Sequence, residues 1–173
     1  KNILKEFNYS DKTEALRELK KLVVANINKN DFIAAQYYNN KLLLINSESY
    51  ESNRDKAFIS YNLHDLTTSE EFINKALQIN NKEVFGLNIY SLIQISYNNY
   101  ENAIIALRKA IKIDRKYIDS YNNLGTCLFK IEKIAEAFNN FKKAYKLNKN
   151  NTNTLINIGN ILSLNDKYTQ AIN

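Results

Sequence analysis

Hydrophobic positions along this chain recur with the spacing of amphipathic helices. The clearest stretch has apolar or small residues at i, i+3, i+4 and i+7, namely Tyr121, Leu124, Gly125 and Leu128. This is the spacing of one face of an α-helix. Polar pairs such as Asn30-Asp31 separate these stretches, and their side chains can cap helix ends. The pattern therefore predicts an all-α protein without a sheet.

The hydrophobic pattern repeats with a period of 34 residues. An aliphatic residue followed by Asn or Asp recurs at Ile45-Asn46, Ile79-Asn80, Ile113-Asp114 and Leu147-Asn148. Small residues share the period at Ser69, Ala103, Ala137 and Ala171, and large residues share it at Leu87, Tyr121 and Leu155. Two amphipathic halves repeat together, so the unit is a pair of helices. We expect nine helices from residue 11 onward.

One array of helix pairs is expected to occupy residues 1–173. The pairs are predicted at about 16–49, 50–83, 84–117 and 118–151, with a partial pair at 152–173. Residues 1–15 are interpreted as a helix that precedes the first pair. Because the chain starts at Lys1, contains no methionine and stops inside a pair, we expect it to be a fragment of a longer protein.

Two local signals predict where helices begin and end. Thr68 and Glu71 have the spacing of a capping box, so a helix is expected to begin at Thr68. Asn165-Asp166 is expected to form the turn inside the fifth pair.

The repeated motif resembles the tetratricopeptide repeat. It is carried by Tyr121-x2-Leu124-Gly125-x2-Leu128 followed by Ala137-x3-Phe141, and the family's 34-residue unit is a helix-turn-helix. The resemblance implies a right-handed superhelical solenoid of antiparallel helix pairs, whose first helices line a concave groove. It also implies that contacts between neighbouring repeats stabilise the array.

The first repeat departs most from the family's pattern. Val23 and Leu42 stand where the family has small residues, and Asn39 stands in the position of a large apolar residue. The family's proline after the second helix is missing throughout, since the chain contains no proline.

Composition excludes several classes of site. With one cysteine and one histidine, the chain forms no intrachain disulfide and no Cys/His zinc site. No residues suited to nucleophilic or acid–base catalysis recur at a useful spacing, and His64 and Cys127 are expected to be dispensable. We therefore expect no enzyme activity, no cofactor and no metal.

The net charge of +6 raises the question of an acidic partner. No phosphate-binding loop accompanies the lysine cluster of the fourth repeat, which consists of Lys142, Lys143, Lys146 and Lys149. We interpret the cluster as a solvated outer face, and we do not expect nucleic acid as the partner.

The sequence says little about the compartment. No apolar run approaches the roughly 20 residues that span a bilayer, and no signal segment opens the chain. The cytoplasm is favoured, and the cell envelope is the alternative if a signal or anchor precedes Lys1.

The groove face of the third repeat is unusually apolar. If each first helix turns about 100° per residue, Phe85, Ile89 and Leu92 lie opposite a core face that is also apolar. Exposed apolar surface often marks an interaction site. We predict that these residues, with Phe58 adjacent, form the floor of a ligand pocket. The alternative is that the folded monomer buries them.

Polar groove residues are predicted in the last two repeats. Asn123 and Asn157 occupy equivalent positions, and Thr126 shares the face of Asn123. A carboxamide offers a donor and an acceptor that suit a peptide backbone of any sequence, and similar asparagine ladders line grooves of some family members. Chance is the alternative in so asparagine-rich a chain. The family's carboxylate clamp is not expected, because basic groove residues do not continue into the third repeat.

These observations favour a non-enzymatic adaptor that binds a peptide or helix of a partner protein in the groove. One alternative is a targeting module of a larger enzyme, such as a glycosyltransferase, since such arrays are often fused to catalytic domains. The other is self-association into a homo-oligomer.

Overall fold

The computed structural model of the chain describes residues 3–7 and 9–172 and contains ten helices within them. The helices are α1 (Ile3–Glu6), α2 (Lys12–Asn28), α3 (Phe32–Ile45), α4 (Tyr50–Asn62), α5 (Leu66–Ile79), α6 (Val84–Ser96), α7 (Tyr100–Ile113), α8 (Ile118–Lys130), α9 (Ile134–Leu147) and α10 (Thr152–Ile172). These residues include no strand. The predicted all-α class and the nine helices beyond residue 11 are confirmed.

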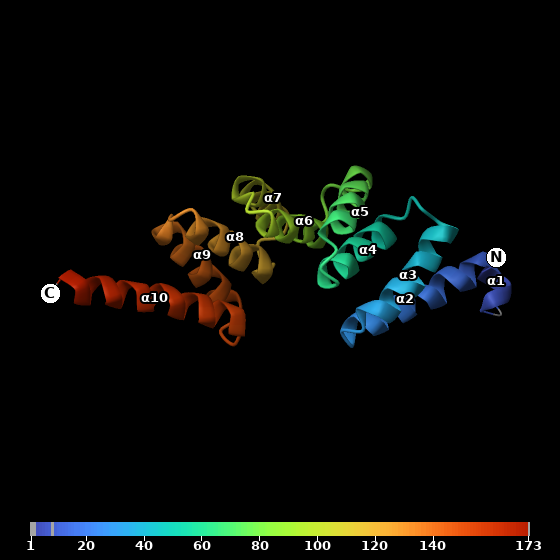
Figure 1. The fold of residues 1–173 in the computed structure, drawn as a ribbon, viewed down its shortest axis with the longest axis horizontal. Coiled ribbons are helices and arrows are strands. Elements are labelled where there is room, and N and C mark those ends of the chain that lie inside the picture. The colour runs from blue at the N-terminus through green and yellow to red at the C-terminus, as the bar shows by residue number, and fades with distance from the viewer. Residues whose placement is uncertain (1–2, 8, 173) are drawn as a thin grey trace. The chain divides into compact units, whose positions relative to one another are not determined.

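The helices form successive pairs in two compact units, residues 1–81 and 82–173. The first unit contains the pairs α2/α3 and α4/α5, and the second contains α6/α7 and α8/α9 followed by α10. Figure 1 shows the two members of each pair side by side. The unit boundary lies two residues before the predicted boundary between the second and third repeats.

A left-handed residue ends the first helix of each pair. Four residues 34 positions apart have φ between 58° and 63°: Asn30, His64, Asn98 and Glu132. The N–H of the next residue donates to a carbonyl five residues earlier, at 2.8–2.9 Å, in Asp31–Asn26, Asp65–Ser60, Asn99–Gln94 and Lys133–Leu128. This bond closes a Schellman-type cap. The chain therefore reverses in the same way in all four repeats.

In the first two repeats, the residue after the left-handed residue is the N-cap of the second helix, and its side chain accepts a hydrogen bond from that helix. Asp31 accepts from the N–H of Ala34, and Asp65 accepts from the N–H of Thr68, both at 3.0 Å. The prediction that a helix begins at Thr68 is therefore wrong. Asp65 satisfies the first free N–H groups one turn earlier, so α5 begins at Leu66.

The recurring Asn or Asp between repeats caps the second helix. The N–H groups of Asn46, Asp114 and Asn148 donate to the carbonyl four residues earlier at 2.9–3.0 Å. Their Oδ1 atoms accept from the N–H two residues later at 3.1, 2.8 and 2.9 Å. This Asx turn ends the helix and redirects the chain. It explains the 34-residue recurrence of these residues.

Close contact between the helices of the fourth repeat depends on a glycine. A Cβ at Gly125 of α8 would lie 2.5 Å from Cε1 of Phe141 on α9. Only a residue without a side chain lets the ring approach so closely. Phe141 is 2% exposed and belongs to the core of the second unit, with Leu107, Leu124 and Leu128.

The unusual residues of the irregular first repeat are buried. Val23 and Leu42 are buried in one core cluster, so larger side chains fill the space that small residues leave elsewhere. Asn39 is also fully buried, and its Nδ2 donates to the carbonyl of Ser52 at 2.9 Å. Its Oδ1 has no hydrogen-bond partner among the described residues.

The N-terminal residues and the last helix differ from the predicted pattern. Among the described residues before Asp11, only Ile3–Glu6 is helical, and α2 begins at Lys12, earlier than the predicted repeat. Lys1, Asn2, Asn8 and Asn173 lie outside the described residues. α10 continues through Asn165-Asp166 to Ile172, so the predicted turn is absent there. Asn and Asp disfavour a helix interior only weakly, unlike Pro.

Candidate functional site

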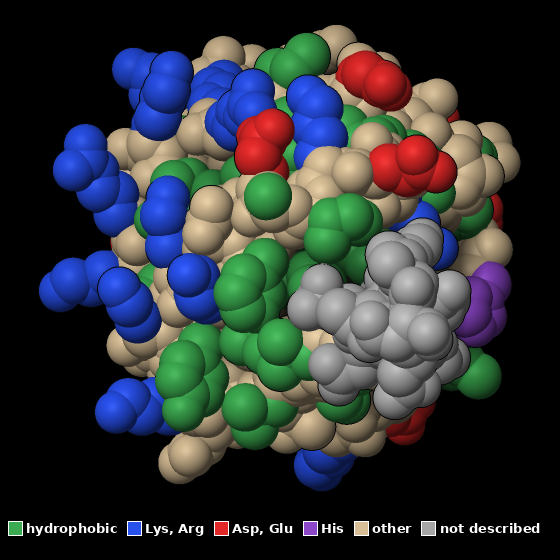
Figure 2. Space-filling model, turned by 90° about the vertical axis from the view of Figure 1, so that its left-hand side faces the viewer, with side chains coloured by type: hydrophobic (Ala, Val, Ile, Leu, Met, Phe, Trp, Pro, Cys, Tyr) green, Lys and Arg blue, Asp and Glu red, His purple; other side chains and the backbone are tan. Residues whose placement is uncertain are grey.

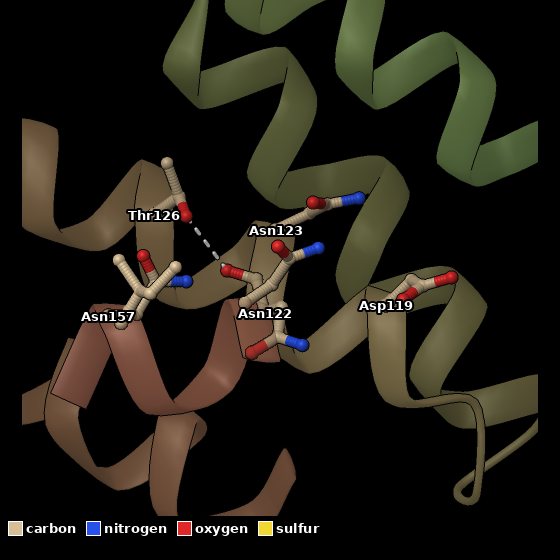
Figure 3. Close-up of a pocket in the computed structure, with 7 residues that line it drawn as sticks. Asp119, Asn122, Asn123, Thr126 and Asn157 are labelled. Carbon is tan, nitrogen blue, oxygen red and sulfur yellow. Dashed lines mark hydrogen bonds between the residues drawn. The ribbon is translucent and has the colours of Figure 1, made fainter. Parts of the chain in front are cut away.

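A polar hollow of about 230 Å³ lies between α8 and α10 in the second unit. It is lined by Asp119, Asn122, Asn123, Thr126, Asn153, Ile156 and Asn157. Figure 3 shows the α8 side chains on successive turns and Asn157 on the neighbouring α10. The two helices are the first helices of consecutive repeats, which are the helices that the sequence analysis expected to line the groove.

The structure brings together the three polar residues predicted for the groove. Asn123, Thr126 and Asn157 all line this hollow and are half-buried. Nδ2 of Asn123 lies 3.4 Å from Oδ1 of Asn88, and the hydroxyl of Thr126 donates to the carbonyl of Asn122 at 3.0 Å. Among the described residues, the side chain of Asn157 has no hydrogen-bond partner. Its donor and acceptor are therefore open to a ligand.

The apolar part of the predicted site is arranged differently. Ile89 is 1% exposed, so it offers no surface to a ligand, and its assignment to a pocket floor is corrected. At this position the helix is buried on its second face as well as on its core face. Phe85 and Leu92 are half-buried. Phe58 belongs to the first unit and packs edge-on against Phe32, with ring centroids 6.1 Å apart.

Buried polar pairs connect consecutive first helices in the second unit. Nδ2 of Asn88 donates to the hydroxyl of Ser120 at 2.8 Å, which joins α6 to α8. At the equivalent positions one repeat later, the hydroxyl of Thr154 donates to Oδ1 of Asn122 at 2.9 Å, which joins α10 to α8. All four side chains are buried. Buried polar groups need such partners because an unpaired one costs about 1–3 kcal/mol.

The sequence offered a signal for these pairs that the groove prediction missed. Asn88 and Asn122 are 34 residues apart, as are Ser120 and Thr154. Polar residues that recur at a fixed place in an otherwise apolar face indicate a repeated interhelical bond. Asn88 and Asn122 therefore form a buried rank of asparagines, which adds to the predicted rank of Asn123 and Asn157, whose side chains are half-buried.

The lining of the hollow is uncharged apart from one carboxylate. Asp119 stands at its edge, and partial removal from water raises the pKa of this carboxyl. Residues 82–173 carry the whole net charge, with 13 basic and 7 acidic residues against 11 and 11 in residues 1–81. No lysine or arginine is among the described residues that line the hollow. Its chemistry suits a neutral, hydrogen-bonding ligand better than a polyanion.

Cys127 and His64, the two residues considered for catalysis, lie in the core and in a helix-ending turn, respectively. Cys127 is buried, and burial raises the pKa of its thiol to about 12, which keeps it protonated. His64 is the exposed left-handed residue of the second repeat. Within the described part of the chain, no group of His, Cys, Asp and Glu side chains could hold a metal ion. None of its helices is long and apolar enough to cross a membrane.

Comparison with protein families decides the assignment of the repeats. A family model described as TPR repeat matches residues 94–131, and one described as tetratricopeptide repeat matches residues 118–151. The chain carries tetratricopeptide repeats. These repeats are scaffolds of protein–protein interaction and are typically not catalytic. No curated protein sequence matches the chain.

Several solved tetratricopeptide-repeat structures share the fold. PilF of Pseudomonas aeruginosa is 22% identical over 91% of this chain and 72% of its own, with a TM-score of 0.80. MamA of Desulfovibrio magneticus RS-1 is 13% identical over 92% and 90%, with a TM-score of 0.75. The first repeat domain of RPAP3, bound to the HSP90 peptide SRMEEVD, is 14% identical over 69% and 94%, with a TM-score of 0.64. Such low identities establish the fold alone.

Proposed function

We propose that this tetratricopeptide-repeat chain is a non-enzymatic scaffold that binds an extended peptide segment of a partner protein in the hollow between α8 and α10. The observation that carries the proposal is the convergence of Asn123, Thr126 and Asn157 on one hollow, with the carboxamide of Asn157 left open to a ligand. A carboxamide can accept from a peptide N–H and donate to a peptide carbonyl, so it binds backbone regardless of sequence.

Two further residues of the hollow indicate which side chains the ligand should carry. Ile156 is 55% exposed and lies beside the amides, where it can contact an apolar side chain. Asp119 lies at the edge as the single carboxylate of the lining and attracts a cationic group of the ligand. The expected ligand is therefore a neutral or basic peptide with an apolar residue. The peptide SRMEEVD bound by the RPAP3 domain carries more acidic than basic residues and so fits this hollow poorly.

Selection of peptides from a displayed random library, followed by calorimetry with the selected peptide, tests the proposal. Each hydrogen bond contributes about 0.5–1.5 kcal/mol, so Asn157→Ala or Asn123→Ala should weaken binding by about 2- to 10-fold. The melting temperature should change little for Asn157→Ala, because that side chain bonds to no described residue.

Asn102→Ala and Asn139→Ala are the matched controls, since both residues are exposed on second helices. They should leave affinity unchanged. If Asn157→Ala and Asn123→Ala change the affinity for the selected peptides no more than the control substitutions do, the hollow is not the binding site.

The two alternative functions predict other results. A targeting module of a larger enzyme would bind in the same hollow, and only the sequence beyond either end of this chain distinguishes it from an adaptor. A self-association module would show a concentration-dependent mass in sedimentation without any added peptide.

A further inference from the structure

A second hollow, of about 350 Å³, is lined by side chains of α7, α8 and α9. Its lining shares no residue with that of the polar hollow, so it lies on another side of α8. More of its lining surface is apolar than polar, and it combines aliphatic residues with cations: Ile111, Leu124, Leu128, Arg108, Lys112 and Lys143. We call it the basic hollow.

The cations of the basic hollow are available to a ligand. Arg108 lies 3.9 Å from Glu136, and both side chains are more than half exposed, so their mutual attraction is weak. Lys112 and Lys143 are exposed, and neither has an ion-pair partner among the described residues. Three cations against the one carboxylate of Glu136 make the lining attractive to an anionic ligand.

The basic hollow belongs to the more basic unit of the chain. Residues 82–173 carry 13 basic and 7 acidic residues. In the view from the side of the C-terminal helices, Lys and Arg side chains gather along one edge, with few Asp and Glu side chains among them (Figure 2). The field of such a surface attracts an acidic partner before contact is made.

The second repeat shows which side chain fits beside such a lysine. Phe72 of α5 stands two repeats before Asn140, and Lys75 stands two repeats before Lys143. Nζ of Lys75 lies 4.6 Å from the centre of the Phe72 ring, as in a cation–π contact. The fourth repeat keeps the lysine but has Asn140 in place of the aromatic ring, and Asn140 lines the basic hollow.

We propose that the basic hollow binds an acidic segment of a partner protein that inserts one aromatic side chain between α7 and α9. The aliphatic lining fits the ring, in the place that Phe72 takes in the second repeat. Arg108, Lys112 and Lys143 fit carboxylates on either side of the ring. The apolar lining and the carboxylate of Glu136 suit a protein segment better than the closely spaced phosphates of a nucleic acid.

This site is additional to the polar hollow, which is expected to bind a neutral or basic peptide. The two hollows lie on different sides of α8 and differ in the charge of their linings. The scaffold therefore holds two segments of opposite charge preference.

A fluorescent peptide with the sequence EEDFEDE tests the proposal. The chain of residues 1–173 is titrated into the peptide at an ionic strength of about 0.15 M, at which charges more than about 8 Å apart are largely screened. Saturable binding is expected. Alanine in place of the phenylalanine should weaken it by about 10- to 100-fold, the effect of burying an aromatic side chain. Equal affinity for the two peptides, or no saturable binding, would overturn the proposal.

Asn140→Phe separates binding from folding. The new ring should lie in the basic hollow beside Lys143, as Phe72 lies beside Lys75. Because it fills an apolar space, the melting temperature should stay the same or rise, whereas peptide binding should fall by about 10-fold or more. Asn139→Phe, on the exposed neighbour outside the lining, is the matched control and should leave binding unchanged. Unchanged binding by a folded Asn140→Phe chain would refute the proposal.

Charge reversal tests the cations. Lys112→Glu with Lys143→Glu should weaken peptide binding by about 10-fold or more, because carboxylates then face carboxylates. Lys109→Glu with Lys146→Glu makes the same change of net charge on the same two helices but outside the lining, and should have a much smaller effect. An equal loss in both variants would show that the peptide follows net charge and not the basic hollow.

Two further measurements identify the site and its occupant. Asn157→Ala, in the polar hollow, should leave binding of this peptide unchanged, so failure of this proposal is distinguishable from failure of the proposed function. A single-stranded oligonucleotide should not displace the peptide. Displacement by an oligonucleotide whose own binding falls steeply between about 50 and 200 mM salt would assign the basic hollow to nucleic acid and overturn the proposal.

Discussion

The hydroxyl of Thr154 donates a hydrogen bond to Oδ1 of Asn122 across 2.9 Å, with both side chains buried between α10 and α8. The bond repeats the link from Asn88 to Ser120 at a distance of one repeat. These two pairs form polar connections between successive first helices, and Asn122 of the second pair itself lines the candidate hollow.

Thr154→Val keeps the shape of the side chain and removes its hydroxyl. The Thr154 hydroxyl lies 2.9 Å from Oδ1 of both Asn122 and Asn151, so its removal takes a donor from this pair of acceptors, which should lower the free energy of unfolding by about 1–2 kcal/mol. Thr152→Val is the control, since Thr152 is exposed at the start of the same helix. Chemical denaturation measures both variants, and an equal effect would contradict a structural role of the pair.

Asn39→Leu should stabilise the first unit. Asn39 occupies the position of Ile73, Leu107 and Phe141 in the other repeats, and its buried Oδ1 has no partner in the described part of the chain. A leucine removes that unpaired acceptor and adds apolar contact, so the free energy of unfolding should rise by about 1–2 kcal/mol. Asn74→Leu, on an exposed residue of α5, should change it little. A lower melting temperature for Asn39→Leu would show that the bond to Ser52 matters more.

Glu132→Gly should stabilise the fourth repeat. Glu132 has a φ of 63°, a left-handed conformation that costs a residue with a Cβ about 1 kcal/mol and costs glycine nothing. The gain should appear as a melting temperature higher by a few degrees. Glu132→Ala removes the same carboxylate without relieving the backbone, so it should give no comparable gain.

Ile89→Lys should unfold or strongly destabilise the chain, because Ile89 is 1% exposed. An ammonium group forced into an apolar site should lower the free energy of unfolding by about 3 kcal/mol or more. Ile105→Lys is the matched control, since Ile105 is 68% exposed and should tolerate the change within about 0.5 kcal/mol. A well-folded Ile89→Lys protein that loses only partner binding would restore Ile89 to the predicted ligand floor.

The thiol of Cys127 should be almost unreactive in the folded chain. Its pKa is raised to about 12 by burial, against about 8.5 for a free cysteine. At pH 8 an aromatic disulfide reagent should react at least about 1000-fold faster with the denatured protein. Because the folded pKa is the higher one, the thiol's contribution to stability is present below pH 8.5 and is lost as the pH rises toward 12. Rapid labelling of the native protein would contradict this placement.

The sequence alone determined the architecture, because the architecture depends on interactions between near neighbours. Apolar residues three and four positions apart define each helix, and Asp31, Asp65 and the Asx residues between repeats cap helix ends within a few positions. Such contacts recur wherever the 34-residue pattern recurs. The all-α class, the helix pairs and the equivalence of Asn123 with Asn157 were predictable for this reason.

Only the tertiary structure decided which repeated residues remain accessible. Asn122 and Asn123 are adjacent asparagines, yet the first is buried and bonded to Thr154, whereas the second is half-buried. Leu128 and Leu162 hold the same place in their repeats, yet one is covered and the other half exposed. The same residue in the same repeat position is buried or available according to the helices packed around it, and those helices are distant in sequence. The local sequence pattern does not show which distant helices pack around a residue. The burial of each residue, and therefore the candidate sites, could be determined only from the tertiary structure.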